Sequence, residues 1–178
     1  MEQGPEHPEQ SSNPEPISEP QAAPSQMVAA FEHAHADCVS ERVEAYGEIT
    51  IIVPREKIIE ACSAMKMEFQ FDFLADICGA DRGVEEEPRF EVNYHLFSTK
   101  HFRRLRLKVL LNEEDAHVPS VVTVWRTANW HERETFDLFG VIFDGHPDLR
   151  RILLPEDWQG YALRKDFPLR GYEPYSLK

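Results

Sequence analysis

The stretch from Asn129 to Pro168 holds the residues of this chain that most resemble a chemical site. His131 and Glu132 begin like the HExxH motif, in which two histidines one helical turn apart hold zinc and the glutamate acts as a base. The position of the second histidine is occupied by Thr135. The sequence therefore excludes a zinc protease site of this type.

An acid/base or metal cluster is the other chemistry that this stretch could support. Its candidate residues are Glu132, Glu134, Asp137 and His146. If this part of the chain forms a helix, the first three side chains point in different directions around it and cannot meet at one ion or one substrate. We therefore expect surface charges, with one ion pair between Arg133 and Asp137, which stand four residues apart.

The cysteines and the other histidines indicate no further site. Cys38, Cys62 and Cys78 contain no CxxC pair, and no nearby histidine stands at a spacing typical of a zinc or cluster site, so they are expected to be reduced, buried thiols. His33 and His35 are two residues apart and would not share a helix face. The eight glycines form neither a GxGxxG nor a GxxxxGK(S/T) phosphate loop. We therefore expect this chain itself to bind no cofactor.

Charge and composition narrow the classes of partner. The formal net charge is −13, and the first 41 residues hold eight acids without a Lys or Arg, so nucleic acid is not an expected partner. No apolar run approaches the roughly 20 residues of a membrane-spanning helix, so membrane association is expected only through partners. Residues 1–25 are rich in Pro, Glu, Gln and Ser and are expected to be a disordered tail.

The elements that must position these residues are predicted from hydrophobic periodicity. Apolar residues at helical spacing follow Ser25 and follow Pro54, which predicts two helices. Proline suits the first position of a helix. Phe69, Phe71 and Phe73 alternate with polar residues and predict a half-buried strand. The second helix is expected to end near Met67, and the other strands are expected at Val39–Ala45, Glu48–Val53, Phe90–Leu96 and Leu105–Leu111.

The two strongest alternating segments lie on either side of residues 98–101 and predict a β-hairpin. Pairing Phe97 with Phe102 sets its register. This register places Glu91 directly opposite Lys108, as a cross-strand ion pair.

A third helix is predicted over Trp130–Phe139. Asn129 as N-cap, with Glu132 three residues later, matches a capping box, and Gly140 supplies the stop. Hairpins and helices without regular strand and helix alternation predict an α+β fold. We expect a compact domain over residues 26–143, with a mixed or antiparallel sheet packed by two to three helices.

Residues 144–178 are expected to form an extended C-terminal arm that binds a partner. Beyond Leu154 the chain loses its periodicity, yet it remains rich in aromatic residues, prolines and arginines, the types enriched at interfaces. A segment of this kind cannot build its own core, so we expect it to lie across a partner protein. The expected aromatic anchors are Trp158, Tyr161, Phe167, Tyr172 and Tyr175.

The same stretch carries a resemblance to a known family. Its most specific residues run from Glu132 to Gly140, then through His146, Pro147, Leu149, Arg150, Arg151 and Leu153, and then through Asp157, Trp158, Gly160, Leu163, Arg164, Lys165, Asp166 and Pro168. In this order they resemble the signature of the 30 kDa-type subunit of NADH:quinone oxidoreductase, respiratory complex I. The resemblance extends with decreasing specificity to about Met27. One departure is Ala162, where the family usually has proline.

This resemblance implies a structural and assembly role in the hydrophilic arm of a proton-pumping enzyme. It implies that FMN and the Fe–S clusters, which pass electrons from NADH to quinone, belong to other subunits and that this chain has no active site. The implied partners are the subunit that helps to form the quinone site and neighbouring Fe–S subunits. The implied location is peripheral, on the cytoplasmic face of the bacterial inner membrane or on the matrix side in an organelle.

The residues expected to contact a partner divide by role. Arg133 and Asp137 orient the helix end, and His146 and Pro147 shape the following turn. Polar contacts are expected from Arg150, Arg151, Arg164, Lys165 and Asp166, and apolar anchoring from Trp158, Tyr161 and Phe167.

Two alternatives remain open on the sequence alone. One is a homologous subunit of another membrane-bound redox complex, such as an energy-converting hydrogenase or a quinone reductase with a different electron donor. The more distant one is a stand-alone soluble hydrolase that uses Glu134, Asp137 or His146.

Overall fold

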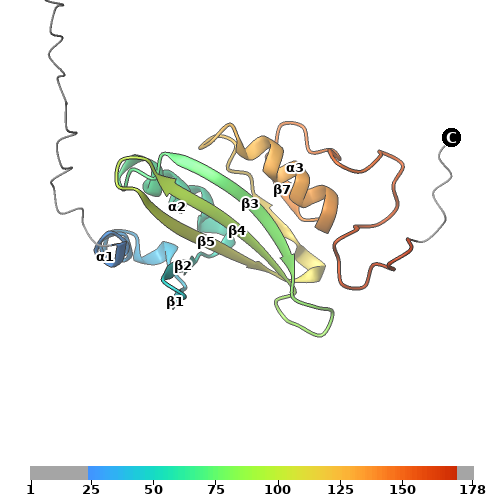
Figure 1. Cartoon of the computed structure of the whole chain (residues 1–178), viewed down its shortest axis with the longest axis horizontal. Coiled ribbons are helices and arrows are strands. Elements are labelled where there is room, and N and C mark those ends of the chain that lie inside the picture. The colour runs from blue at the N-terminus through green and yellow to red at the C-terminus, as the bar shows by residue number, and fades with distance from the viewer. Residues whose placement is uncertain (1–23, 172–178) are drawn as a thin grey trace, which may run out of the picture.

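The structure is a computed structural model and describes residues 24–171 of the chain (Figure 1). Its helices are α1 (Pro24–Ala34), α2 (Ile58–Met67) and α3 (Ala128–Phe139), with short 3-10 helices η1 (Ala36–Cys38), η2 (Arg55–Lys57) and η3 (Glu113–Asp115). Its strands are β1 (Glu41–Ala45), β2 (Glu48–Ile52), β3 (Phe73–Asp81), β4 (Phe90–Ser98), β5 (Arg103–Leu111), β6 (His117–Pro119) and β7 (Ile142–Asp144).

The five longer strands form one mixed sheet in the order β1-β2-β5-β4-β3. Neighbouring strands are antiparallel except β2 and β5, which run parallel and are connected through α2, β3 and β4. Strands β6 and β7 form a separate two-stranded parallel sheet, and α3 lies between them in the chain. The predicted α+β class, with a mixed sheet and helices packed on it, is therefore confirmed.

Helices α2 and α3 cover the same face of the large sheet, and within residues 24–171 no helix covers the other face, here called the open face (Figure 1). Tyr94 of β4 is fully buried in one apolar core with Cys62 of α2. Gly79 of β3 pairs with Val92, two residues from Tyr94 and on the same side of the sheet. A Cβ atom at Gly79 would lie 2.6 Å from the ring of Phe139, so glycine is what allows α3 to approach the sheet this closely.

The predicted hairpin is formed by β4 and β5, but its predicted register was wrong by two residues. Phe97 pairs with Arg104 rather than with Phe102, because the turn is longer than the sequence pattern suggested. Lys108 consequently stands opposite Asn93. The expected ion pair still forms, because Lys108 Nζ reaches the Glu91 carboxylate diagonally at 2.7 Å.

A strand was predicted from Phe69, Phe71 and Phe73, but the observed strand β3 begins only at Phe73. Gln70 has a positive φ of 58°, and the N–H of Phe71 donates to the carbonyl of Met65, so this segment closes the end of α2. Phe71 is buried while Phe73 is 51% exposed. The alternation therefore reflects packing around a helix end and not a pleated strand.

The start of α3 also differs from the prediction. The helix begins at Ala128, two residues earlier than expected, and Thr127 at the N-cap position makes no side-chain capping bond. The proposed capping box between Asn129 and Glu132 does not form, because the Glu132 carboxylate accepts bonds from a preceding loop. Gly140 does end the helix, in the left-handed conformation with φ of 76°.

The ends of the chain limit two further predictions. Helix α1 begins at Pro24, inside the segment predicted to be a tail, and the rest of that prediction lies outside the described residues. The anchors expected at Tyr172 and Tyr175 lie outside them as well. Between residues 24 and 171, no helix combines the length and the apolar character needed to cross a membrane.

Candidate functional site: α3 and the C-terminal arm

The residues after β7, here called the arm (residues 145–171), run as irregular chain along the C-terminal half of α3 (Figure 1). They have no strand or helix in the range that the structure describes. Their conformation is nevertheless fixed by hydrogen bonds to side chains and carbonyls of the domain. The bonds that hold the arm to the domain begin at one carboxylate of α3.

Asp137 is the residue that fixes the beginning of the arm. Its side chain is fully buried, and Oδ2 accepts the backbone N–H groups of Ile152, Leu153 and Leu154 at 3.0, 2.7 and 2.8 Å. Oδ1 accepts Nη1 of Arg151 at 2.7 Å. Burial alone would raise the pKa of Asp137, but these four donors outweigh it and hold the pKa below its usual value. The prediction that Asp137 is a surface charge paired with Arg133 was wrong.

Arg151 continues the same network along the arm. Besides Asp137 Oδ1, its guanidinium donates to the carbonyls of Asp137, Trp158 and Gly160 at 2.9, 3.1 and 3.0 Å. Arg133, one turn before Asp137, donates to the carbonyls of Arg150 and Arg151 at 3.2 and 3.1 Å. Guanidinium groups suit this task because they present several donors in a fixed plane. Together the two arginines satisfy backbone groups that a strand or helix would otherwise satisfy.

The end of α3 receives the next part of the arm. Leu163 N–H donates to the carbonyl of Leu138 at 3.1 Å, and Arg164 Nε donates to the carbonyl of Phe139 at 2.7 Å. These bonds satisfy carbonyls that are left free at a helix C-terminus. A Cβ at Gly140 would come within 2.5 Å of the Tyr161 ring, so the glycine is required both for its positive φ and for this contact.

The far end of the arm is tied to the sheet by a buried ion pair. Arg89 binds Asp81 through Nε and Nη2 at 3.1 and 2.9 Å, and it also contacts Asp166 at 2.7 Å and Glu113 at 2.7 Å. The Lys165 N–H donates to Asp81 Oδ2 at 2.7 Å. Burial alone would raise the pKa of Asp81. The bond from Arg89 and two backbone N–H groups outweigh it and lower this pKa to about 2.

Glu132 occupies the N-terminal half of α3 and, like Asp137, has no exposed surface. Its carboxylate accepts Ser120 Oγ at 2.6 Å and the Val121 N–H at 2.7 Å. Within residues 24–171 neither a lysine nor an arginine pairs with it. Burial therefore dominates and raises the pKa of Glu132 to about 7, although the two bonds act in the opposite direction. The expectation of a surface charge was wrong here too.

The candidates for an acid/base cluster are not brought together. Glu134 is exposed, Glu132 faces the core, and Asp137 is saturated by the arm. His146 lies in the turn after β7, where Nδ1 accepts the Asp148 N–H at 3.0 Å and Nε2 lies 3.2 Å from the Asn129 carbonyl. These contacts fix the orientation of the imidazole ring. His146 thus shapes the turn.

The predicted partner contacts divide into inward and outward side chains. Arg133, Asp137, Arg151 and Arg164 make the internal bonds above, so any effect on a partner is through the shape of the arm. Trp158 and Phe167 are half-buried, with their rings stacked 6.1 Å apart, and Tyr161 lies under Arg164. The side chains that reach the surface are those of Pro147, Arg150, Lys165 and Asp166.

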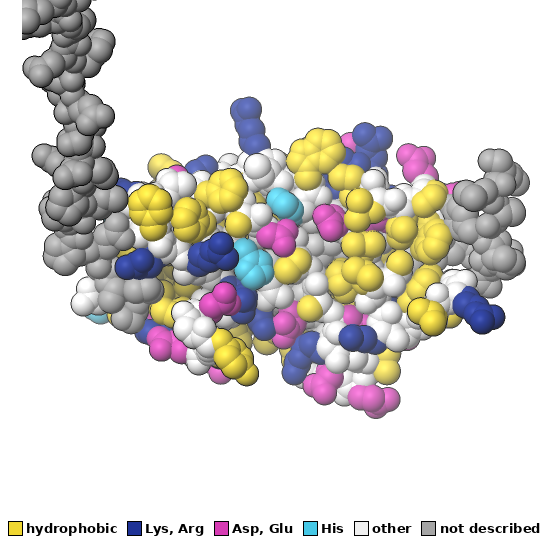
Figure 2. Space-filling view, in the orientation of Figure 1, with side chains coloured by type: hydrophobic (Ala, Val, Ile, Leu, Met, Phe, Trp, Pro, Cys, Tyr) yellow, Lys and Arg dark blue, Asp and Glu magenta, His cyan; other side chains and the backbone are white. Residues whose placement is uncertain are grey.

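Four exposed apolar side chains on α3 and the arm were missed by the sequence reasoning. Trp130 is 61% exposed, Leu153 60%, Leu163 52% and Leu169 fully exposed. Figure 2 shows hydrophobic side chains gathered over this part of the molecule. The signal available in the sequence was the presence of leucines in a segment without periodicity, which cannot bury them in a core of its own.

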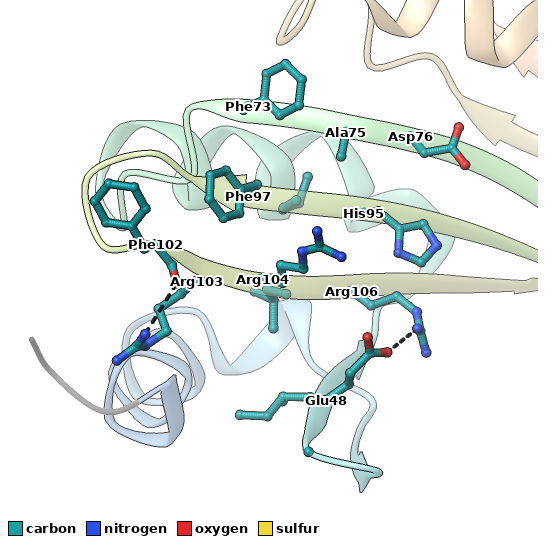
Figure 3. A pocket seen from close by; sticks show the side chains of 14 residues that line it. Glu48, Phe73, Ala75, Asp76, His95, Phe97, Phe102, Arg103, Arg104 and Arg106 are labelled. Atoms are coloured by element: carbon teal, nitrogen blue, oxygen red, sulfur yellow. Dashed lines mark hydrogen bonds and ion pairs between the residues drawn. The ribbon is translucent and has the colours of Figure 1, made fainter.

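The open face of the large sheet carries a hollow with a volume of about 680 Å³ (Figure 3). It is lined by Phe73, Phe97 and Phe102 at one end and by His95 and Arg106 at the other. Figure 3 shows these side chains rising from β3, β4, β5 and the turn between the last two.

A thiol and an imidazole meet on this open face, so nucleophilic catalysis must be weighed there. Cys78 Sγ lies 3.7 Å from His95 Nε2. Burial raises the pKa of the Cys78 thiol, and burial together with the Arg106 charge lowers the pKa of His95. Both shifts oppose the thiolate and imidazolium pair that an activated cysteine needs.

Comparison with protein families identifies relatives over the same region. The statistical model of the family described as "Respiratory-chain NADH dehydrogenase, 30 Kd subunit" matches residues 51–173. A protein of Rhizobium meliloti (strain 1021), named as a subunit of NADH-quinone oxidoreductase, is 53% identical over 131 residues, which is 72% of this chain and 71% of the relative.

Two solved structures resemble the fold. One is described as "Nqo5 of the trypsin-resistant fragment (1-134) in P63 form", with a TM-score of 0.60 and 35% identity, covering 70% of this chain and 99% of that one. The other is from the membrane-bound sulfane sulfur reductase, an archaeal respiratory membrane complex, with a TM-score of 0.69 and coverage of 82% and 85%. At 23% identity the second match shows a shared fold alone.

Proposed function

We propose a role that rests on one finding: this chain belongs to the family of the 30 kDa subunit of respiratory-chain NADH dehydrogenase. The proposed role is that of a docking and assembly subunit of an NADH–quinone oxidoreductase. The match of the family model to residues 51–173 confirms the resemblance that was based on Glu132 to Pro168. The oxidoreductase activity belongs to the complex. This chain contributes a shaped surface, binds none of the redox centres, and leaves FMN and the Fe–S clusters to other subunits.

The observation that carries this proposal is the outward face of the arm. The Asp137 carboxylate and the Arg151 guanidinium hold the arm in a defined shape without a helix or strand. Leu153 and Leu163 are thereby presented to the outside at more than half exposure. Ordering the arm before it meets a partner lowers the entropy cost of association, which is the gain expected from preorganisation.

The partner we propose is the quinone-site subunit, with Fe–S subunits of the hydrophilic arm nearby. Apolar anchoring comes from Leu153, Leu163 and the stacked pair of Trp158 and Phe167. Polar contacts at the rim come from the exposed members of the predicted polar set, which are Arg150, Lys165 and Asp166. Contact with the membrane is indirect, on the cytoplasmic face in a bacterium or on the matrix side in an organelle.

Affinity purification of the tagged full chain from native membranes tests this proposal. We expect an assembly that contains flavin and Fe–S clusters. Recovery of the chain alone would refute a docking role. Recovery with a partner that holds a nickel centre, and no flavin subunit, would favour the alternative of a hydrogenase-type complex.

Surface variants test which residues dock. The double variant Leu153→Asp, Leu163→Asp places charge where we propose apolar contact, and it should abolish co-purification while thermal unfolding of the chain is unchanged. Val84→Asp, at a 54% exposed site in the loop between β3 and β4, is the matched control and should not affect assembly. Trp158→Ala should weaken partner binding by about 2 kcal/mol or more.

The hydrolase alternative finds little support in the geometry. Asp137 is saturated by four donors, both ring nitrogens of His146 are engaged within the turn, and Glu134 is exposed on the surface. A general acid or base must reach a substrate proton. Of these three Glu134 is the exposed one, and the other two are engaged elsewhere and cannot act with it.

A further inference from the structure

A second cluster of side chains with donor atoms lies away from the arm, where α1, η1 and α2 meet. One ring nitrogen of His35, the thiol sulfur of Cys38 and one carboxylate oxygen of Glu60 all lie within 4.8 Å of one another. His35 follows the end of α1, Cys38 ends η1, and Glu60 belongs to the first turn of α2. Three elements therefore bring three different kinds of metal-binding atom to one point.

The 3-10 turn explains why His35 and Cys38 meet. The N–H of Cys38 donates to the carbonyl of His35 at 2.9 Å, which is an i to i+3 bond. A 3-10 helix has three residues per turn, so side chains three positions apart lie on the same side. Two residues between ligands is also the spacing of CxxC zinc sites. The prediction that no histidine stands at a metal-ligand spacing from a cysteine therefore overlooked His35 and Cys38.

A further carboxylate orients the histidine from outside the cluster. His35 Nε2 lies 3.1 Å from Oε2 of Glu68, and the ring is stacked on Phe31 at 5.3 Å between centroids. Metal-binding histidines characteristically bind a carboxylate or carbonyl through the nitrogen that does not hold the metal. The contact with Glu68 engages Nε2 and fixes the ring, so Nδ1 is the nitrogen that we assign to the metal.

The local charge and exposure also suit a cation. Besides Glu60, the carboxylates of Asp37 and Glu68 lie near the cluster, and the Lys57 ammonium contacts Asp37 and Glu60. If Glu60 turns to a metal ion, Lys57 keeps its contact with Asp37. Cys38 is fully buried, while the side chains of His35 and Glu60 are 18% and 49% exposed. An ion can therefore enter from solvent and keep one position for water.

We propose that His35, Cys38 and Glu60 bind a zinc ion, with water as the fourth ligand. Nitrogen, sulfur and oxygen donors in a four-coordinate arrangement are the set that zinc accepts most readily among common biological cations. The ion fastens α1 and η1 to α2, at the end of the molecule away from the arm (Figure 1). This site is independent of the docking role, because none of its residues belongs to α3 or the arm.

Titration of the reduced, metal-free full chain with Zn²⁺ by calorimetry tests the proposal, and Co²⁺ provides a spectroscopic probe. We expect a single binding event, and a thiolate-to-cobalt charge-transfer band in the ultraviolet. Cys38→Ser should remove this band. Glu60→Gln should weaken binding by at least tenfold, and Glu68→Gln by about tenfold through the orientation of His35.

Two variants serve as matched controls. Glu56→Gln removes an exposed carboxylate of η2, and Cys78→Ser removes a thiol that lies beside another histidine, so neither should change zinc affinity. Because Cys38 is buried, Cys38→Ser can fail to fold, in which case the half-exposed Glu60 carries the test. Equal zinc affinity in the wild type and Glu60→Gln, or a cobalt spectrum without a thiolate band, would overturn the proposal.

Discussion

The two halves of α3 each bury one carboxylate, and they do so in opposite ways. At the C-terminal half, Asp137 receives three backbone N–H groups and the Arg151 guanidinium, and its pKa is lowered. At the N-terminal half, Glu132 receives one hydroxyl and one N–H group, and its pKa rises to about 7. Neither side chain has exposed surface, but the Glu132 carboxyl lies deeper in the protein and so loses more of its hydration.

The opposite pKa shifts come from the depth of each carboxylate together with the number and charge of its donors. Removing a carboxylate from water disfavours its ionised form unless other donors replace the hydration. Asp137 obtains that replacement from the arm, so its charge and the ordered arm stabilise each other. Glu132 obtains only a partial replacement from the loop before α3. We infer that the first carboxylate serves to hold the arm and that the second costs stability at neutral pH.

The largest expected effect comes from Asp137→Asn. This change leaves Arg151 without its anionic partner and turns one acceptor oxygen into a donor, so it should reduce the free energy of unfolding by roughly 3–5 kcal/mol. The arm should also be released. Limited proteolysis should then cut within residues 145–171 much faster than in the wild type.

The dependence of stability on acid pH provides a second test of the role of Asp137. Because its folded-state pKa is lowered from 3.8, Asp137 contributes stability at higher pH that is lost as the pH falls through that value and below it. The Asn variant should lack this part of the acid dependence. Glu134→Gln, an exposed change on the same helix, is the control, and an equal effect of both variants on proteolysis would contradict the role of Asp137.

Glu132→Gln should act in the opposite direction. The unfolded carboxyl ionises near pH 4.5 and the folded one near pH 7, so wild-type stability is full below pH 4.5 and is lost as the pH rises to about 7. The loss amounts to about 3 kcal/mol. Glutamine keeps an acceptor for the Val121 N–H without this loss. Urea unfolding at pH 8 should show a more stable variant, with little gain at pH 4.5.

If Glu132→Gln were destabilised equally at pH 4.5 and pH 8, the contrast between Glu132 and Asp137 would be contradicted. Such a result would mean that Glu132 is held by its two hydrogen bonds as firmly as Asp137 is held by the arm. The same measurement on Ser120→Ala provides a control, since loss of one donor should raise the Glu132 pKa further and steepen the dependence on pH.

Gly140→Ala should have an intermediate effect at the junction of helix and arm. A left-handed conformation costs a non-glycine residue roughly 1–2 kcal/mol, and the added Cβ would also meet the Tyr161 ring. We expect a lower melting temperature and release of the arm from Tyr161 onward. Gly145→Ala is an informative control, because its φ is also positive at 81° but no atom lies within 4 Å of the added Cβ.

The smallest expected effect is a stabilisation by Ala162→Pro. The Arg164 N–H donates to the carbonyl of Tyr161 at 3.2 Å, so Ala162 occupies the second position of a turn, where proline is favoured. Proline should add up to about 1 kcal/mol by restricting the unfolded chain. A loss of stability in thermal unfolding would show that the turn needs the Ala162 N–H or another backbone angle.

Local patterns located most of the longer elements but misplaced β3, and they did not identify which groups each buried side chain would meet. Alternation found β4 and β5, and apolar spacing found α2, because these periods report which side of an element faces the core. The same reasoning placed Glu132 and Asp137 at the surface, since periodicity reports direction and not depth. It also missed the role of Asp81, whose partner in the arm, Lys165, is 84 residues away.

The sequence by itself determined the α+β class, the family, and an arm of interface-type residues without its own core. All three are properties of composition and order along the chain. Only the tertiary structure decided which carboxylates are buried with donors, how the arm is held, and that His35 and Cys38 meet Glu60. The physical reason is that hydration and charge pairing depend on groups brought together by folding, and no local spacing encodes those neighbours.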